Sequence, residues 1–200
     1  MHLLFISSEF PDAGNPDLGL DNVSMLNALA DRWKIRAYVP RPVPLGARGV
    51  WQPRAADVAF HPEFVAAPRA PLLGALCNHR LCARALRKPL DLLRRDWQFD
   101  AVLCSGLFPE VCAVARLIDE FHFRFVTVAV GPQADEALKG SSHRKAVARH
   151  IRRAVGVVTS SSPLMALLTK IGFRKDRVTF SSNWGTAAEA CHRLLLLIRH

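Results

Sequence analysis

The sequence predicts an α/β fold, a doubly wound and mainly parallel β-sheet with helices on both faces. Short apolar segments alternate with helical patterns along most of the chain. The short segments are apolar throughout, as in parallel strands that are buried on both faces of a sheet. A regular alternation of strand and helix implies right-handed crossover connections within one sheet.

The first predicted elements are a strand, a helix and a second strand. Leu3–Ile6 is too short for a buried helix, and Pro11 follows soon after it. From Leu20 to Trp33, apolar residues recur at the three-to-four spacing of an amphipathic helix. Ile35–Val39 forms the next strand, which we expect Pro40 to end.

Residues 40–71 hold seven of the thirteen prolines. Proline removes a backbone donor, so this stretch is predicted to be neither one long helix nor a central strand. We expect a strand near Val58–Phe60 with irregular chain on either side. Long loops often carry function, and a plain surface excursion is the other interpretation.

Regular elements return after this stretch. We expect a basic helical region at Leu72–Trp97 that is broken at Pro89. The other expected strands are Ala101–Cys104, Phe125–Val130, Gly156–Thr159 and Arg177–Phe180. The other expected helices are Pro109–Phe121, His143–Arg153, a helix that begins at Ser162 and ends at Gly172, and Ala187–His200.

Composition excludes several classes of protein. The chain has 200 residues, of which 50% are hydrophobic and 22% charged, so it is long and apolar enough for one domain with a sizeable core, and not disordered. No apolar stretch approaches the roughly 20 residues of a membrane span, and no signal peptide is apparent, so we expect a cytoplasmic protein. The five cysteines lack metal-ligand spacing. They predict buried, reduced thiols and no metal site.

The charge is the unusual quantity. Twenty-seven Lys and Arg against 17 Asp and Glu give a net charge of +10, which points to an anionic partner. Two clusters on predicted helices carry much of it and form a candidate anionic-surface site: Arg80, Arg84, Arg87, Lys88, Arg94 and Arg95, then Arg144, Lys145, Arg149, Arg152 and Arg153. Interleaved leucines suit a helix at an anionic membrane interface, or they face the core while the arginines form a solvated surface. Nucleic acid is disfavoured, because aromatic residues are scarce in both clusters and no recognition motif is present.

The loops at the carboxyl ends of the strands hold the candidate substrate-binding residues, because open parallel sheets bind ligands there. The first loop leads from a buried strand to a helix N-terminus, which favours an anion. Its glycines match neither the dinucleotide fingerprint nor a Walker loop, so they also fit a simple turn. The candidates are Gly14, Gly19, Asp21, Ser105, Gly106, Gly131, Asp135 and Ser160.

Three segments, in this order, resemble the N-terminal domain of family 4 glycosyltransferases of the GT-B fold. The first is the strand and loop of residues 3–11, with Pro16-Asp17-Leu18-Gly19 before a helix. The second is Phe99–Pro109, an Asp-led strand and its loop. The third is Ala154–Leu164, which continues through a Gly-containing turn at residues 172–178. The resemblance covers residues 1–185 and leaves residues 186–200 as an atypical, apolar helical tail.

This resemblance implies transfer of a sugar from a nucleotide-sugar to an acceptor, usually with retention of configuration. It implies two Rossmann-like domains that face a cleft, of which the N-terminal one binds the acceptor, often a lipid-linked one. No further cofactor is implied. The sequence contains no counterpart of the C-terminal donor domain, so we expect little activity without a separately supplied one.

Some positions depart from the family pattern. Leu103 and Ser105 stand where the family often has histidines, and Val130 precedes Gly131 where it often has His-Gly. Neither Glu9 nor Asp135 is assigned as a general base, because the sequence specifies no partner for either, and the catalytic residues stay unassigned. The alternative function is a non-catalytic Rossmann-like binding module that docks on an anionic membrane or a protein partner.

Overall fold

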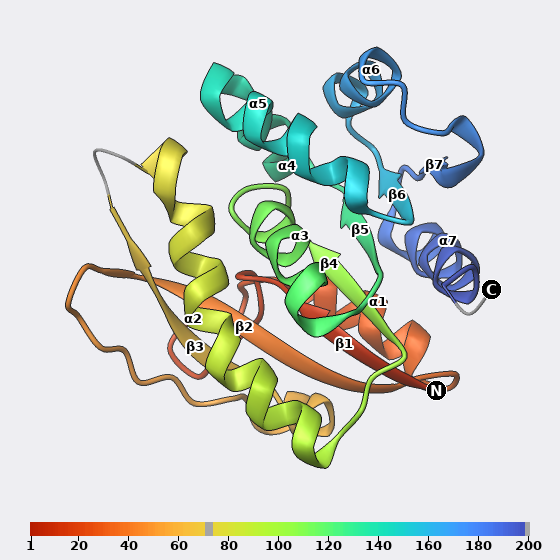
Figure 1. Cartoon of the computed structure of the whole chain (residues 1–200). Helices are drawn as coiled ribbons and strands as arrows, with labels where there is room; N and C mark the ends of the chain where they lie inside the picture. Colours follow the sequence, from red (N-terminus) through yellow and green to blue (C-terminus); the bar gives the residue numbers. More distant parts are fainter. Residues whose placement is uncertain (71–73, 199–200) are drawn as a thin grey trace.

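A computed structural model describes residues 1–70 and 74–198. These residues form a seven-stranded sheet in the order β3-β2-β1-β4-β5-β6-β7, and every pair of neighbouring strands is parallel (Figure 1). The predicted doubly wound α/β fold is therefore confirmed. The strands are β1 (His2–Ile6), β2 (Lys34–Pro44), β3 (Glu63–Arg69), β4 (Ala101–Ser105), β5 (Phe125–Ala129), β6 (Gly156–Thr159) and β7 (Val178–Phe180).

Helices cover both faces of the sheet and form a separate core with each. On one face lie α2, α3, α4, α5 and α6, and on the other α1 and α7 (Figure 1). The α-helices are α1 (Leu20–Ala30), α2 (Gly74–Asp96), α3 (Glu110–Phe121), α4 (Pro132–Lys139), α5 (Ser141–His150), α6 (Ser162–Lys170) and α7 (Trp184–Leu196). The short 3-10 helices are η1 (Ala55–Phe60), η2 (Ile151–Arg153) and η3 (Lys175–Arg177).

The second strand is longer than predicted, because Pro40 does not end it. β2 pairs with β1 only as far as Tyr38, and from there to Pro44 it pairs only with β3. The prolines at 40, 42 and 44 alternate along the strand, so their nitrogens face the same side. Since β2 lacks a β1 partner along this half, the missing N–H groups remove no bond from a ladder with β1. The prediction failed because it assumed pairing on both sides.

Two other predictions need correction. Val58–Phe60 belongs to the 3-10 helix η1, and the strand follows it as β3. Pro89 lies inside an unbroken α2, where Leu86 and Leu90 are fully buried. This packing offsets the hydrogen bond that a proline removes from a helix interior. The start of the predicted region, Leu72 and Leu73, lies outside the described residues.

The last helix is an integral part of the fold. α7 begins at Trp184, so the expected division between residues 185 and 186 falls in its first turn. Its residues Ala187, Cys191 and Leu195 are buried completely, and the helix packs against α1 and β5. Four of the five cysteines are buried, as predicted, and no disulfide joins described residues.

Candidate functional site

The site lies at the carboxyl ends of β1 and β4, which are neighbours in the middle of the sheet. The chain after β1 leads to α1 on one face, and the chain after β4 leads to α3 on the other. The two connections therefore diverge and leave a crevice between them. This is the topological switch point, where open α/β sheets bind their ligands.

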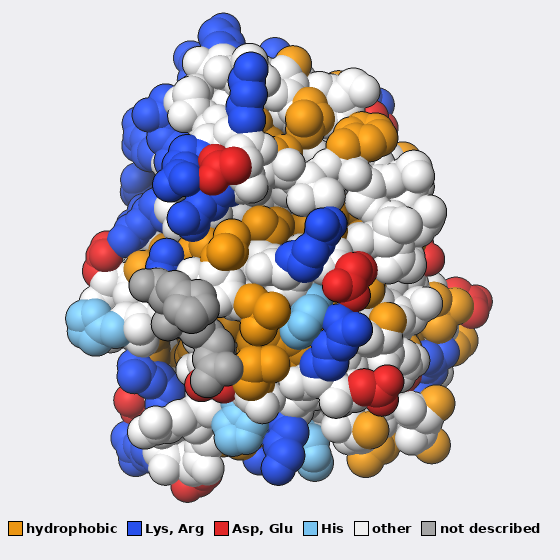
Figure 2. Space-filling view, turned by 90° about the vertical axis from the view of Figure 1, so that its right-hand side faces the viewer, with side chains coloured by type: hydrophobic (Ala, Val, Ile, Leu, Met, Phe, Trp, Pro, Cys, Tyr) orange, Lys and Arg blue, Asp and Glu red, His pale blue; other side chains and the backbone are white. Residues whose placement is uncertain are grey.

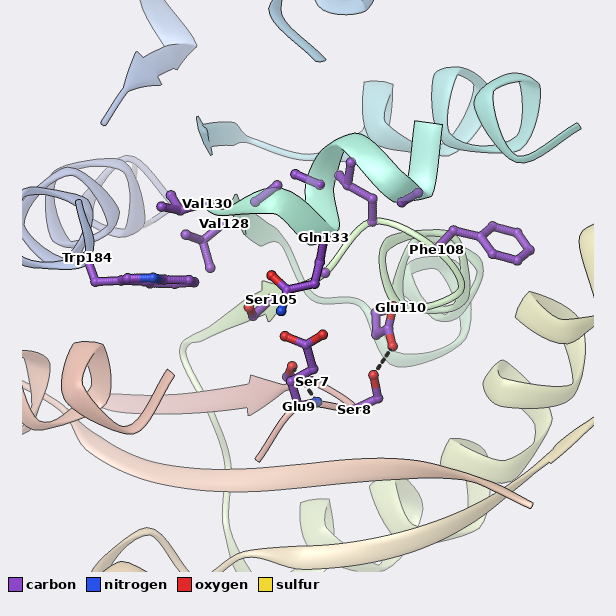
Figure 3. A pocket seen from close by; sticks show the side chains of 15 residues that line it. Ser7, Ser8, Glu9, Ser105, Phe108, Glu110, Val128, Val130, Gln133 and Trp184 are labelled. Atoms are coloured by element: carbon purple, nitrogen blue, oxygen red, sulfur yellow. Dashed lines mark hydrogen bonds between the residues drawn. The ribbon is translucent and has the colours of Figure 1, made fainter. Parts of the chain in front are cut away.

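The crevice has two connected parts. The inner pocket, of about 100 Å³, lies directly over the strand ends (Figure 3). The outer cleft, of about 840 Å³, extends from it toward β2, β3 and α2, and shares Ser8, Phe108 and Glu110 with it. Polar side chains of the inner pocket are Ser7, Ser8, Glu9, Ser105, Glu110 and Gln133. Apolar side chains at its walls include Leu107, Phe108, Val128, Val130 and Trp184.

Glu110, at the start of α3, is the most buried acid of the inner pocket. Its residue exposure is 4%, and the hydroxyl of Ser8 donates a hydrogen bond to its Oε1 (Figure 3). Burial raises the pKa of Glu110, and the negative charge of Glu9 adds to the effect, whereas the Ser8 hydrogen bond and the charge of Arg69 oppose it. This carboxyl group can therefore carry a proton at a higher pH than an exposed one.

Glu9 is the second acid of the inner pocket and points into the same space as Glu110 (Figure 3). Its pKa is also raised, first by burial and then by the negative charge of Asp21. Among the described residues that line this pocket, none is Arg or Lys. Two carboxyl groups in a pocket lined by no Arg or Lys disfavour a phosphate and accept hydrogen bonds from hydroxyl groups. The cation whose charge acts on Glu110 is Arg69, which lines the outer cleft.

A buried asparagine fixes the backbone around these acids. Asn22 of α1 is 1% exposed, and its Nδ2 donates to the carbonyl oxygen of Glu9 at 2.7 Å and more weakly to Ser7 Oγ at 3.4 Å. The hydroxyl of Ser105 donates to Asn22 Oδ1 at 2.8 Å. The ends of β1 and β4 are thus joined through one side chain, so the Glu9 carboxyl starts from a rigid backbone.

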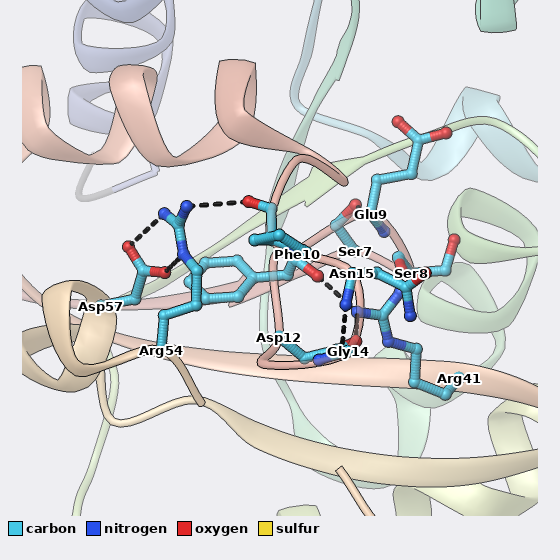
Figure 4. Close-up of polar contacts among 11 residues, drawn as sticks. Ser7, Ser8, Glu9, Phe10, Asp12, Gly14, Asn15, Arg41, Arg54 and Asp57 are labelled. Atoms are coloured by element: carbon cyan, nitrogen blue, oxygen red, sulfur yellow. Dashed lines mark hydrogen bonds and ion pairs between the residues drawn. The ribbon is translucent and has the colours of Figure 1, made fainter. Parts of the chain in front are cut away.

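A buried ion pair holds the rest of the first loop (Figure 4). Arg41 of β2 contacts Asp12 at 2.5 Å, and it also donates to the carbonyl oxygens of Ser8 at 3.1 Å and Phe10 at 2.5 Å. Arg41 and Asp12 are 6% and 2% exposed. A second arginine, Arg54, donates to the Pro16 carbonyl oxygen at 2.8 Å while it pairs with Asp57. The loop is therefore fastened by side chains rather than free to close on a ligand.

Of the eight predicted substrate-binding residues, Ser105 and Gly106 line the inner pocket. The other six do not line this pocket and lie in the segments around it. Gly14 donates its N–H to Asp12 Oδ1, and Gly19 has a left-handed φ of 75° and touches the Glu9 backbone. Asp21 is exposed in the first turn of α1.

The remaining predicted residues lie in the connections after β5 and β6. The N–H of Gly131 donates to Ser160 Oγ at 3.0 Å, and the hydroxyl of Ser161 donates to Asp135. These contacts tie the start of α4 to the start of α6. Gly131, Asp135 and Ser160 therefore hold two connections together and do not line the inner pocket or the outer cleft.

Sequence reasoning missed Glu110, Gln133 and Trp184. An acid in the first turn of a helix is ordinarily a partner of the helix dipole, so Glu110 gave no functional signal. Gln133 lies on α4, a helix that we did not predict although Pro132 stands at a favourable first-turn position. Trp184 opens α7, far from the pocket in sequence, and only the fold brings it there.

All eleven residues of the predicted anionic-surface site are exposed, but they are not equivalent. Arg87 pairs with Glu120 and Arg95 with Asp91, each at 2.8 Å, and Arg153 pairs with Asp119. Arg94 and Arg144 donate to backbone carbonyl groups. The other six form no ion pair with a described residue: Arg80, Arg84, Lys88, Lys145, Arg149 and Arg152. Figure 2, which shows the side of the molecule with β7 and α7, has Lys and Arg side chains gathered toward its upper left.

Within residues 1–70 and 74–198, no group of three or more His, Cys, Asp or Glu side chains is placed to hold a metal ion. No helix in this part of the chain is long and apolar enough to cross a membrane.

Comparison with known proteins supports the fold. No protein-family model and no curated protein matches the sequence. Among solved structures, HepE (Alr3699) of Anabaena in complex with UDP matches 92% of this chain and 44% of its own, with a TM-score of 0.54 and 16% identity. UGT89C1 of Arabidopsis thaliana complexed with UDP matches 90% of this chain and 51% of its own, with a TM-score of 0.51 and 14% identity.

The chain spans about half the length of these two solved proteins. Its fold is that of one Rossmann-like half of a GT-B glycosyltransferase structure. At these identities the likeness concerns the fold, and the site described above has been built from this chain's own residues.

Proposed function

We propose that this chain is the acceptor-binding domain of a glycosyltransferase, of the family 4 type that its sequence segments resemble. The single observation that carries the proposal is the inner pocket, where two acids with raised pKa values face one space at the switch point of the sheet. A sugar donor presents a diphosphate, which Glu9 and Glu110 would repel. An acceptor presents hydroxyl groups, which carboxyl groups bind well.

The outer cleft extends the proposal to the class of acceptor. One part of its wall is apolar, from Pro40, Pro42, Pro68, Cys82 and Phe108. The rest carries polar side chains such as Arg69, Asn78 and His143. A volume of about 840 Å³ is within the range of drug-sized ligand sites. We propose an amphiphilic acceptor, such as a lipid-linked one, with its hydroxylated head in the inner pocket and its apolar part along this wall.

Glu110 is placed to contact the acceptor's hydroxyl group, because it lines both the inner pocket and the outer cleft. A carboxyl group of raised pKa exchanges a proton with a bound hydroxyl more readily near neutral pH than an ordinary one. Transfer itself requires a nucleotide-sugar donor, which we propose is held by a second domain. Activity of this chain by itself is therefore expected to be weak.

Octyl β-D-glucoside, below its micelle-forming concentration, tests this assignment by isothermal titration calorimetry. We expect saturable binding that weakens by about tenfold in Glu110→Gln, since a hydrogen bond to a charged group is lost or weakened. Glu120→Gln is the matched control, because Glu120 is exposed on the same helix and pairs with Arg87 outside the crevice. Equal affinities for wild type and Glu110→Gln would refute the role of Glu110.

A second candidate function is a binding module that docks on an anionic membrane. The observation in its favour is that α5 and η2 present basic side chains with no acid of their own, beside the basic α2. Under this proposal the protein acts peripherally, at a cytoplasmic membrane surface. Flotation with vesicles that contain an anionic phospholipid, at low salt, is expected to recover the protein with the lipid. Recovery with neutral vesicles alone, or with neither kind, would contradict it.

A further inference from the structure

A second group of residues, at the junction of three helices on one face of the sheet, includes three exposed arginines whose charges act on the buried His79. α2, α3 and α5 pack against one another on one face of the sheet (Figure 1). Between them the rings of His79 on α2 and His150 on α5 have centroids 5.4 Å apart. Arg80 and Arg149 are sequence neighbours of these two histidines, so the backbone of both arginines lies at this junction, and both side chains are exposed.

The third arginine comes from α3. Arg116 is exposed on that helix, and its positive charge acts on both histidine rings, as does that of Arg149. Among the described residues, no acid forms an ion pair with Arg80, Arg116 or Arg149. By contrast, farther along the same helices Arg87 and Arg153 are each paired with an acid of α3. The three arginines of this junction therefore have no ion-pair partner among the described residues, as is also true of Arg84, Lys88, Lys145 and Arg152 elsewhere on the basic surface.

The two histidines add polar atoms without adding charge at neutral pH. His79 is 6% exposed, and its Nδ1 is buried without a hydrogen-bond partner. Burial lowers its pKa to about 4, with His150, Arg116, Arg80 and Arg149 contributing in the same direction. The pKa of His150 is lowered by burial and by Arg116, Arg149 and Arg153, against the hydrogen bond from its ring to the Ala146 carbonyl oxygen.

We infer that Arg80, Arg116 and Arg149 form a binding site for a phosphate group with two negative charges, at the junction of α2, α3 and α5. Guanidinium groups bind phosphate oxygens through paired N–H donors, and three of them from three helices surround an anion from different directions. Such a ligand would also relieve the mutual repulsion of the three cations. This site is next to the acceptor site, because His79 also contacts Phe108, which lines the inner pocket and the outer cleft. It differs in charge, with arginines where the inner pocket has acids.

The probe is inorganic pyrophosphate at low ionic strength, with binding followed by NMR of the histidine ring resonances. We expect saturable shifts of the His79 and His150 signals and a rise in the pKa of both rings, because a bound anion offsets the field of the arginines. The variant Arg116→Gln/Arg149→Gln should bind at least about tenfold more weakly. It should keep its thermal stability, since exposed and unpaired arginines are replaced.

The matched control is Arg87→Gln/Arg95→Gln, which removes the same net charge from the paired part of the basic surface. It is expected to change pyrophosphate affinity by less than about threefold. Equal losses in both double variants would mean only diffuse charge attraction and would overturn the site. Absence of histidine shifts in wild type would overturn it as well.

Two further samples distinguish the sources of the phosphate group. Vesicles with phosphatidic acid present a terminal phosphate, whereas vesicles with phosphatidylglycerol present a singly charged diester. Preference for phosphatidic acid vesicles that is lost in Arg116→Gln/Arg149→Gln supports a lipid headgroup. Pyrophosphate binding without such a preference supports a free phosphate compound. Equal binding of both vesicles by wild type and variant, with no pyrophosphate site, contradicts the proposal.

Discussion

Replacement of His79 by Phe is expected to protect the protein from acid. His79 is buried between the ring of Phe108, with centroids 5.8 Å apart, and that of His150. Its buried Nδ1 has no partner, so a phenyl ring of similar shape fills the space without loss of a hydrogen bond. Charging His79 in the folded protein is unfavourable, because burial and the cations Arg80, Arg116 and Arg149 oppose it.

The magnitude follows from the lowered pKa. The pKa of His79 is about 4 in the folded chain and 6.5 for an ordinary histidine. A lowered pKa contributes stability that is present above 6.5 and is lost as the pH falls toward 4. The loss attributable to this ring is about 2 kcal/mol at pH 5 and about 3 kcal/mol at pH 4. The lowered pKa of His150 also reduces the free energy of unfolding as the pH falls. Because His150 is present in both proteins, this contribution largely cancels in the difference between them.

Urea denaturation of wild type and His79→Phe at pH 7, 6, 5 and 4 measures this difference. We expect the variant's advantage in free energy of unfolding to grow by about 3 kcal/mol between pH 7 and pH 4. The Glu136→Gln variant, changed at an exposed position on α4, serves as a control. An advantage of His79→Phe that stays constant with pH would refute the reasoning, whatever its size.

Three other substitutions test the frame of the site. Asp12→Ala leaves Arg41 charged and buried, so it should cost about 3–5 kcal/mol of unfolding free energy in urea denaturation; a loss below about 1 kcal/mol would contradict the importance of this ion pair. Gly19→Ala should destabilise more than Gly172→Ala, because both glycines have a positive φ but only at Gly19 would a Cβ meet backbone, 2.4 Å from the Glu9 carbonyl group. Equal losses in thermal unfolding would show that only the backbone conformation matters. Glu110→Gln should become more stable than wild type as the pH rises above 4.5, since a raised pKa contributes stability that is lost with increasing pH. Parallel stability curves from pH 4 to 8 would argue against this.

The fold could be predicted because strand and helix patterns are local. Segments such as Leu3–Ile6 and Ala101–Cys104 are apolar runs whose length alone favours a buried strand, and both are strands in the structure. The prolines of β2 misled the prediction, since their tolerance depends on which side of the strand is paired. Which side of a strand is hydrogen-bonded depends on the whole sheet and cannot be predicted from the sequence of that strand alone.

From the sequence, the candidate site could be located only to the edge of the sheet where the parallel strands end. The rule that ligands bind at the carboxyl ends of parallel strands pointed to this edge, and two residues chosen by that rule, Ser105 and Gly106, line the inner pocket. Glu110 acquires its raised pKa from burial beneath the Ser8 loop, about a hundred residues away in sequence, and no local pattern records that. The same holds for the basic surface, where ion pairs between α2 and α3 decide which arginines are uncompensated.

The central claim is that the inner pocket takes a hydroxylated group and excludes a diphosphate. Trp184 lines this pocket, so the indole N–H resonance of Trp184, assigned with Trp184→Phe, reports on its occupancy. The measurement is a titration of this signal with octyl β-D-glucoside and, separately, with UDP. We expect a saturable shift with the glucoside and none with UDP. A shift of the Trp184 signal with UDP, and none with the glucoside, would contradict this claim.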